Sequence, residues 1–214
     1  MNKLLIFDVD GVLEKEERMV KARHSAYIKA IMNRFKVSKK EAEKRYSEAK
    51  NKLPPKKKYT SAYKFMKCGF TRKEYFRLLD KVDPEGIVSG HKNCIPMLKK
   101  LEKKNKIITY SNASRKATNK TLKVLKIDKL IDKAYSVEDF KESKPSTKNL
   151  KKMMKDMGFK AKDTIFIGNS LKKDILPAKQ LGIKTILFDP YGEYKNPKEA
   201  DFVIKDLIEV VRLV

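Results

Sequence analysis

The 214-residue sequence lacks the features that hold small secreted proteins together or place a protein in a membrane. Its two cysteines, Cys68 and Cys94, are too few for a disulfide framework, so we expect both to be buried, reduced thiols. No apolar run is long enough to span a bilayer. Asp8 and Asp10 interrupt the short apolar segment near the N-terminus, which argues against a signal peptide. We therefore expect a cytoplasmic protein with no membrane partner.

Acidic residues are also scarce, with 27 Asp and Glu against 52 Lys and Arg and a formal net charge of +25. The lysines are spread through almost every expected helix and loop, whereas a nucleic-acid-binding protein more often concentrates its charge in one patch with interleaved aromatic residues. We therefore expect a solvated basic surface with a general attraction for anionic ligands, and at most nonspecific binding of nucleic acid. A basic nucleic-acid-binding protein is the alternative from another functional class.

Hydrophobic residues make up 41% of the chain, which is enough for a core, and the first apolar run is Leu4 to Phe7. This run predicts a strand buried on both faces, and it leads directly into Asp8, Asp10 and Gly11. Ligands of open α/β sheets bind beyond the carboxyl ends of the strands. Two carboxylates so close repel unless a cation offsets their charge, and Mg²⁺ prefers a few carboxylates plus phosphate oxygens. The simpler alternative is a strand followed by an acidic turn.

After this first strand the sequence follows a helical periodicity for about seventy residues. Two patterns of a hydroxyl residue followed three positions later by glutamate predict capping boxes, Ser38 with Glu41 and Thr71 with Glu74. We therefore expect an all-helical insertion over residues 15–85.

From residue 86 onward, helical and strand patterns alternate. The expected strands are residues 106–110, 134–137, 164–167, 185–188 and 202–204. Strands that alternate with helices favour an α/β fold with a doubly wound parallel sheet.

Several residues at the ends of these strands, and one in a loop, have side chains suited to phosphoryl transfer. They are Asp8 and Asp10, Ser111 and Asn112, Asn169 and Asp174, with Lys144 in a loop before a helix. Asp8 could attack phosphorus, and Asp10 could protonate the leaving oxygen and then activate water. Ser111, Lys144 and Mg²⁺ would neutralise charge on the phosphoryl oxygens.

Four segments, in order, resemble the motifs of the haloacid dehalogenase superfamily. They are Asp-Val-Asp-Gly-Val at 8–12, Ser111, Lys144-Pro145, and Gly-Asn-Ser-Leu-Lys-Lys-Asp at 168–174. Together these motifs frame the chain. The resemblance implies a Rossmann-like core formed by residues 1–14 and 86–214, and a helical C1-type cap formed by residues 15–85.

The resemblance also implies a role for each motif residue. The expected catalytic residues are Asp8 as nucleophile and Asp10 as general acid and base. The expected phosphate-binding residues are Ser111, Asn112 and Lys144, and Lys144 is also expected to orient Asp8. The expected Mg²⁺ ligands are Asp8, the main-chain carbonyl of Asp10, Asn169 and Asp174. The expected activity is Mg²⁺-dependent hydrolysis of small phosphomonoesters through an aspartyl-phosphate.

One motif position departs from the family pattern. Many phosphatases of the family carry an acid where this chain has Asn169, whose amide oxygen can bind Mg²⁺ but without the charge. Metal affinity would then be weaker, and a catalytically weak relative that binds nucleic acid is the alternative function. Haloacid dehalogenases proper lack the second acid of the first motif, so Asp10 favours phosphate chemistry. Nothing in the sequence singles out a phosphomutase.

The cap region is loosely similar to those of pyrimidine 5′-nucleotidase and phosphoglycolate phosphatase-like members. Tyr59 and Tyr63 could stack on a base, which would favour a nucleotide, although tyrosines at helical spacing are also typical of a core. Lys56, Lys57 and Lys58 could attract an anionic substrate, although such a run is also typical of a solvated loop. Nucleotides, phosphoglycolate and sugar phosphates therefore remain alternatives, and no pattern indicates an oligomeric state.

Overall fold

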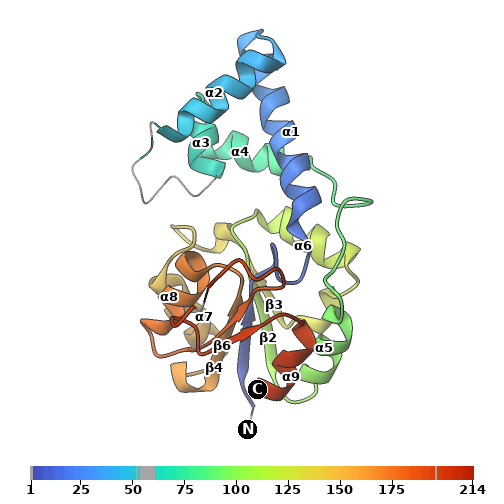
Figure 1. Cartoon of the computed structure of the whole chain (residues 1–214), viewed down its shortest axis with the longest axis vertical. Helices are drawn as coiled ribbons and strands as arrows, with labels where there is room; N and C mark the ends of the chain where they lie inside the picture. The colour runs from blue at the N-terminus through green and yellow to red at the C-terminus, as the bar shows by residue number, and fades with distance from the viewer. Residues whose placement is uncertain (1, 52, 54–60, 196) are drawn as a thin grey trace. The chain divides into compact units, whose positions relative to one another are not determined.

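The structure, a computed structural model, describes residues 2–51, 53, 61–195 and 197–214. It divides into two compact units, each of which is considered by itself (Figure 1). Met1–Glu16 and Val88–Val214 form the first, here called the core unit, and Glu17–Ile87 form the second, the helical unit. The helical unit starts and ends two residues after the limits of the predicted insertion at 15–85. None of the described helices is both long and apolar enough to cross a membrane.

The core unit is built on a six-stranded parallel sheet in the order β3-β2-β1-β4-β5-β6. The strands are β1 (Leu4–Phe7), β2 (Lys106–Tyr110), β3 (Lys133–Tyr135), β4 (Thr164–Gly168), β5 (Lys184–Phe188) and β6 (Phe202–Ile204). This topology confirms the predicted α/β fold with a doubly wound parallel sheet. β1 lies at the centre, where Ile6 is in register with Ile108 of β2 and Phe166 of β4.

One predicted strand is displaced. The sequence pattern predicts residues 134–137, whereas β3 ends at Tyr135. The side chain of Ser136 accepts a hydrogen bond from the Glu138 nitrogen at 3.2 Å and caps a short 3₁₀ turn, η3 (Val137–Asp139). Hydroxyl side chains that bond to nearby backbone compete in this way with the sheet.

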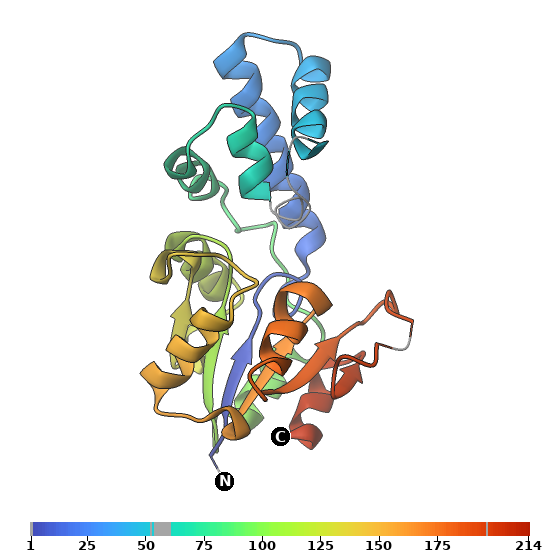
Figure 2. The same cartoon turned by 90° about the vertical axis from the view of Figure 1, so that its left-hand side faces the viewer.

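Helices cover both faces of the sheet, α7 and α8 on one side and α5 and α9 on the other (Figure 1). Figure 2, turned by 90°, shows α7 and α8 in front of the strands. The helices of the core unit are α5 (Cys94–Leu101), α6 (Arg115–Val124), α7 (Thr147–Met157), α8 (Leu176–Lys179) and α9 (Val210–Leu213), with short 3₁₀ turns η2 (Asp128–Leu130), η4 (Ala161–Asp163) and η6 (Leu207–Glu209) and a π-helical turn η5 (Leu171–Ile175).

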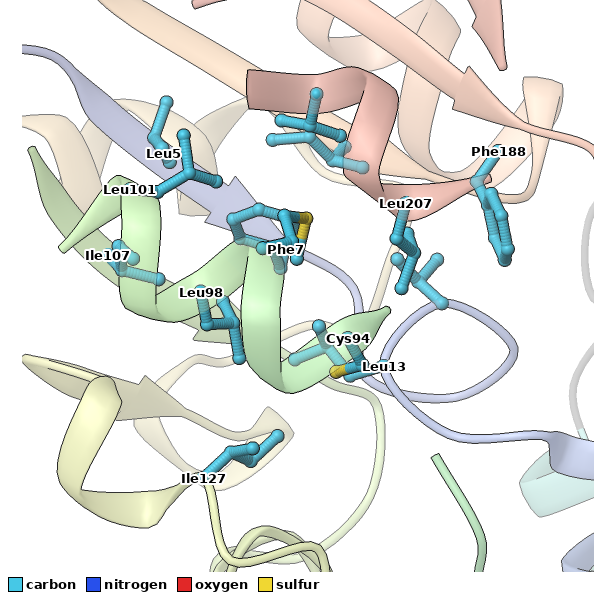
Figure 3. Close-up of a cluster of buried hydrophobic side chains, with 14 of the residues drawn as sticks. Leu5, Phe7, Leu13, Cys94, Leu98, Leu101, Ile107, Ile127, Phe188 and Leu207 are labelled. Atoms are coloured by element: carbon cyan, nitrogen blue, oxygen red, sulfur yellow. The ribbon is translucent and has the colours of Figure 1, made fainter. Parts of the chain in front are cut away.

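The helices on both faces of the sheet explain why β1 is apolar throughout. Leu5 and Phe7 pack with α5 on one face, as Figure 3 shows, whereas Leu4 and Ile6 pack with Met153 of α7 on the other. All four strand residues are fully buried. Burial of each of these side chains contributes about 1.5–3 kcal/mol to the free energy of unfolding, so β1 helps to hold the helices on both faces of the sheet.

The helical unit consists of α1 (Glu16–Phe35, whose first residue belongs to the core unit), α2 (Lys39–Asn51), α3 (Ser61–Lys67) and α4 (Arg72–Leu79). An aromatic cluster forms its core, with Tyr27 stacked on Tyr46 and on Tyr75 at centroid distances of 5.7 and 5.8 Å. Thr71 and Glu74 form the predicted capping box at α4. Tyr59 and Lys56 to Lys58 lie outside the described residues.

Candidate active site

The carboxyl ends of β1, β2 and β4 meet at one edge of the core unit. Asp8 follows β1 and continues the ladder, because its nitrogen donates to the Ile167 carbonyl at 2.9 Å. Ser111 follows β2, and Asn169 follows β4. Parallel pairing therefore collects side chains that are more than a hundred residues apart in the sequence.

Lys144 joins two of the predicted acids. Its Nζ lies 2.8 Å from Oδ1 of Asp8 and 2.9 Å from Oδ1 of Asp174, and all three residues are buried. Burial works against the charge of the Lys144 amine, but Asp174 and Asp8 outweigh it and hold the pKa of Lys144 above its usual range. The site therefore contains a protonated lysine shared by two carboxyl groups.

Asp8 nevertheless ionises less readily than an ordinary aspartate. Burial, reinforced by Asp174 and Asp10, raises the pKa of Asp8 to about 8 in spite of Lys144. Oδ1 of Asp8 accepts hydrogen bonds from Lys144 and from the Val9 nitrogen at 2.7 Å. Oδ2 of Asp8 has no hydrogen-bond partner among the residues that the structure describes. This oxygen is available to a phosphorus atom or to a cation.

Asp174 is held by the segment that precedes it. A Cβ at Gly168 would lie 2.5 Å from Cβ of Asp174, so only glycine permits this close approach. The Ser170 nitrogen donates to Oδ2 of Asp174 at 3.1 Å, and the Ser170 hydroxyl accepts from the Lys173 nitrogen at 3.3 Å. The Gly-Asn-Ser sequence that begins at the last residue of β4 thus fixes the carboxylate that Lys144 contacts.

Gly11 has an equivalent function beside Asn169. Its φ is +79°, and a Cβ there would lie 2.1 Å from Nδ2 of Asn169 and 3.2 Å from Cδ of Glu16. The Asn169 amide and the Glu16 carboxyl group therefore both lie against the bare backbone of Gly11.

Ser111 and Asn112, the two predicted phosphate-binding residues that follow β2, make contacts that the sequence did not indicate. The Ser111 hydroxyl donates to Oδ2 of Asp10 at 2.9 Å and accepts from the Ala113 nitrogen at 3.0 Å. Oδ1 of Asn112 accepts from the main-chain nitrogen of Lys144 at 2.7 Å. In this structure Ser111 orients Asp10, and Asn112 holds the loop that carries Lys144; phosphate binding by both stays a prediction.

A cavity of about 250 Å³ opens at this edge of the sheet. Its walls are formed by Asp8, Asp10, Glu16, Asn112, Lys144, Asn169, Ser170, Lys173, Glu193 and Tyr194. Five of the seven predicted site residues line it, while Ser111 and Asp174 lie behind the wall in contact with Asp10 and Lys144.

Comparison with known proteins identifies the family. The model of the haloacid dehalogenase-like hydrolases matches residues 5–188, which include all four motifs. The chain belongs to this family. A crystal structure of a HAD phosphatase from Thermococcus onnurineus has the same fold, with a TM-score of 0.77 and 20% identity over 100% of this chain and 97% of the other.

Two curated relatives are similar over shorter stretches. Glyceraldehyde 3-phosphate phosphatase of Methanocaldococcus jannaschii is 36% identical over 92 residues, 42% of this chain and 40% of that protein. Pyrophosphatase PpaX of Halalkalibacterium halodurans is 28% identical over 112 residues, 51% of this chain and 52% of that protein. The matches thus span about half the length of these relatives or less.

The structure of this hydrolase adds wall residues that sequence reasoning missed. Glu193 and Tyr194 follow β5, Lys173 lies in η5, and Glu16 begins α1. The signal for the first two was that β5 ends at the same edge as the motif strands, so the loop after it had to lie near the site. No local pattern distinguishes these side chains from the other exposed charges of a basic chain.

Proposed function

We propose that this hydrolase is a Mg²⁺-dependent phosphatase that removes phosphate from small phosphomonoesters through an aspartyl-phosphate on Asp8. The observation that carries the proposal is the arrangement around Lys144. Its amine contacts Oδ1 of both Asp8 and Asp174, and Oδ2 of Asp8 has no hydrogen-bond partner among the described residues. A nucleophile with one oxygen fixed and the other available is suited to attack a bound phosphoryl group.

In the first half-reaction, Oδ2 of Asp8 forms a bond to phosphorus while the bond between phosphorus and the leaving oxygen breaks. Asp10, oriented by Ser111, gives its proton to that oxygen. In the second half-reaction, Asp10 takes a proton from the water that attacks phosphorus, and Asp8 is released with inorganic phosphate. Lys144 stabilises negative charge throughout because its two carboxylate contacts hold it protonated.

The donor set fits a divalent cation. Lys144 contacts the carboxyl groups of Asp8 and Asp174, and the charges of Asp174 and Asp10 add to the effect of burial in raising the pKa of Asp8. No cluster of three or more metal-ligating Asp, Glu, His or Cys side chains occurs among the described residues. We propose that Asp8, Asp174, Asn169 and the Asp10 carbonyl hold Mg²⁺, with substrate and water completing its shell. When bound, Mg²⁺ would neutralise charge on the phosphoryl oxygens.

We further propose that the helical unit acts as a cap. Its two connections to the core unit lie side by side within that unit, where the Lys15 nitrogen donates to the Ser89 carbonyl at 2.8 Å and the His91 nitrogen donates to the Leu13 carbonyl at 3.4 Å. Two connections held together in this way are suited to hinge motion. Opening would admit substrate, and closure would exclude bulk water.

The curated relatives widen the set of candidate substrates. One relative is named for glyceraldehyde 3-phosphate and another for pyrophosphate, and nucleotide 5′-phosphates are the third candidate class. Tyr63, one of the two tyrosines proposed to stack on a base, is half-buried on α3, and Tyr59 lies outside the described residues. A substrate panel therefore needs all three classes.

Hydrolysis of p-nitrophenyl phosphate tests the activity. We expect turnover with Mg²⁺, little turnover with EDTA, and none with Asp8→Asn. Asp128→Asn is the matched control, because Asp128 is exposed on η2, away from the cavity wall. Folded wild-type protein that shows no more metal-dependent turnover than Asp8→Asn would contradict the proposal.

Nucleic-acid binding is the second candidate, because the positive charge, although spread along the chain, is densest in one region. Residues 17–87 contain 21 Lys and Arg against 8 Asp and Glu, so about half of the net charge lies in a third of the chain. Titration of labelled RNA and DNA between 50 and 200 mM salt separates the outcomes. Binding that persists at high salt with a defined site would support this function, whereas complete loss would indicate nonspecific attraction.

A further inference from the structure

The loop after β5 places a glutamate on the cavity wall. Asp189, a buried carboxylate, accepts hydrogen bonds from the Glu193 nitrogen at 2.9 Å and the Tyr194 nitrogen at 3.0 Å. The chain turns between them at Gly192, where φ is +70°. The Tyr194 hydroxyl donates to the Asn169 carbonyl at 3.3 Å. The backbone of Glu193 is therefore fixed at the cavity by contacts on either side of it.

The cavity wall carries lysines and carboxylates, and the proposed phosphoryl chemistry does not involve all of them. Lys144 is shared between Asp8 and Asp174, and Lys173 is the second lysine of the wall. Glu193 adds a carboxylate that the proposed phosphoryl chemistry does not employ. Its neighbour Tyr194 contacts the carbonyl of Asn169. Glu193 thus lines the same cavity as Asp8, the proposed nucleophile.

We propose that Glu193 makes this site selective for phosphomonoesters whose leaving group is uncharged and carries hydroxyl groups. This inference rests on the proposed phosphatase function. A second anionic group on the substrate would face the Glu193 carboxylate and be repelled, whereas a hydroxyl group could donate a charge-assisted hydrogen bond to it.

Two esters of nearly equal size isolate the charge. 2-Hydroxyethyl phosphate ends in an uncharged CH₂OH group, whereas 2-phosphoglycolate ends in a carboxylate at the same position. For the wild-type protein we expect kcat/KM to be about tenfold or more higher for the hydroxyethyl ester, mainly through KM, because the repulsion acts on binding. Raising the salt concentration should shrink the difference, since screening weakens it. Equal or reversed preference in the wild-type protein would overturn the inference.

Glu193→Gln and Glu193→Lys test the residue itself. We expect the preference for the hydroxyethyl ester to fall about three- to tenfold in Glu193→Gln and further in Glu193→Lys. Glu199→Gln and Glu199→Lys are matched controls, because Glu199 is exposed in the same unit but does not line the cavity. A preference that changes less than twofold in the Glu193 variants, or equally in both pairs, would overturn the role of Glu193.

A binding measurement separates this inference from the proposed function. Calorimetric titration of Asp8→Asn with each ester, in the presence of Mg²⁺, reports the charge preference without turnover. Absence of metal-dependent hydrolysis of any ester would contradict the phosphatase. Weaker binding of 2-phosphoglycolate that Glu193→Lys reverses would support the charge selection whether or not turnover occurs, and equal affinity for both esters would contradict it.

Discussion

Oδ1 of Asn112 accepts a hydrogen bond from the main-chain nitrogen of Lys144 at a distance of 2.7 Å. This contact joins the end of β2 to the loop before α7, across 32 positions of sequence. It means that the position of the Lys144 amine between Asp8 and Asp174 depends on a residue that touches neither carboxylate. Asn112 is thus a positioning residue in this structure, whatever it contributes to phosphate binding.

Asn112→Ala should lower both stability and activity. The Lys144 nitrogen would lose its acceptor in a partly buried place, which costs about 1–3 kcal/mol in the free energy of unfolding. We expect kcat to fall about tenfold, because Lys144 is no longer held in place. Asn112→Asp keeps an acceptor oxygen and should restore most of the stability. Chemical denaturation and p-nitrophenyl phosphate kinetics measure the two effects, and unchanged kcat in a folded Asn112→Ala protein would refute the positioning role.

Lys144→Ala should be strongly destabilising in metal-free protein. It leaves the buried carboxyl groups of Asp8 and Asp174 without their shared cation, and breaking a buried pair in this way costs about 3–5 kcal/mol. Lys148→Ala, an exposed lysine on the first turn of α7, should change the free energy of unfolding by less than about 0.5 kcal/mol. Urea denaturation in EDTA compares the two. Similar midpoints for both variants would show that the charges around Lys144 contribute little.

Gly168→Ala should disrupt the position of Asp174. Its new Cβ would lie 2.5 Å from Cβ of Asp174, whereas at Gly90 the nearest atom would be 3.5 Å away, an ordinary contact. Neither glycine has a positive φ, so the pair differs in available space and not in backbone strain. We expect Gly168→Ala to lose more than about 2 kcal/mol and most metal-dependent activity, and Gly90→Ala to lose less than about 1 kcal/mol. Equal thermal midpoints would argue that the backbone after β4 can shift freely.

Glu74 predicts a pH dependence of stability in the helical unit. Hydrogen bonds from the backbone and hydroxyl of Thr71, then the contact with Arg34, lower the pKa of Glu74 to about 2 from its ordinary value of 4.5. A lowered pKa in the folded state adds stability above pH 4.5 that is lost as the pH falls toward 2. Glu74→Gln should therefore melt at a lower temperature than wild type at pH 6, and the two proteins should converge near pH 2. Circular dichroism measures both melting temperatures. A difference between them that stays constant from pH 6 to pH 2 would exclude the ionised Glu74 as its source.

Local patterns were enough to predict much of the architecture. The apolar run from Leu4 to Phe7 predicts a strand buried on both faces, because helices cover both faces of a parallel sheet. Thr71 with Glu74 predicts a helix start, because both partners lie within one turn. The displaced end of β3 marks the limit of such patterns, since Ser136 bonded to its own neighbours instead of continuing the sheet.

The sequence by itself determined the family, the parallel sheet and the chemical types of the motif residues, because these depend on short segments and on the order of segments along the chain. Only the tertiary structure decided which partners those residues have. Ser111 meets Asp10 across 101 positions, and Tyr194 meets Asn169 across 25. Such contacts arise from the pairing of strands and the course of loops between them, so no local pattern encodes them. For the same reason the sequence did not indicate that Glu193 lines the cavity, since the buried carboxylate of Asp189 holds it there.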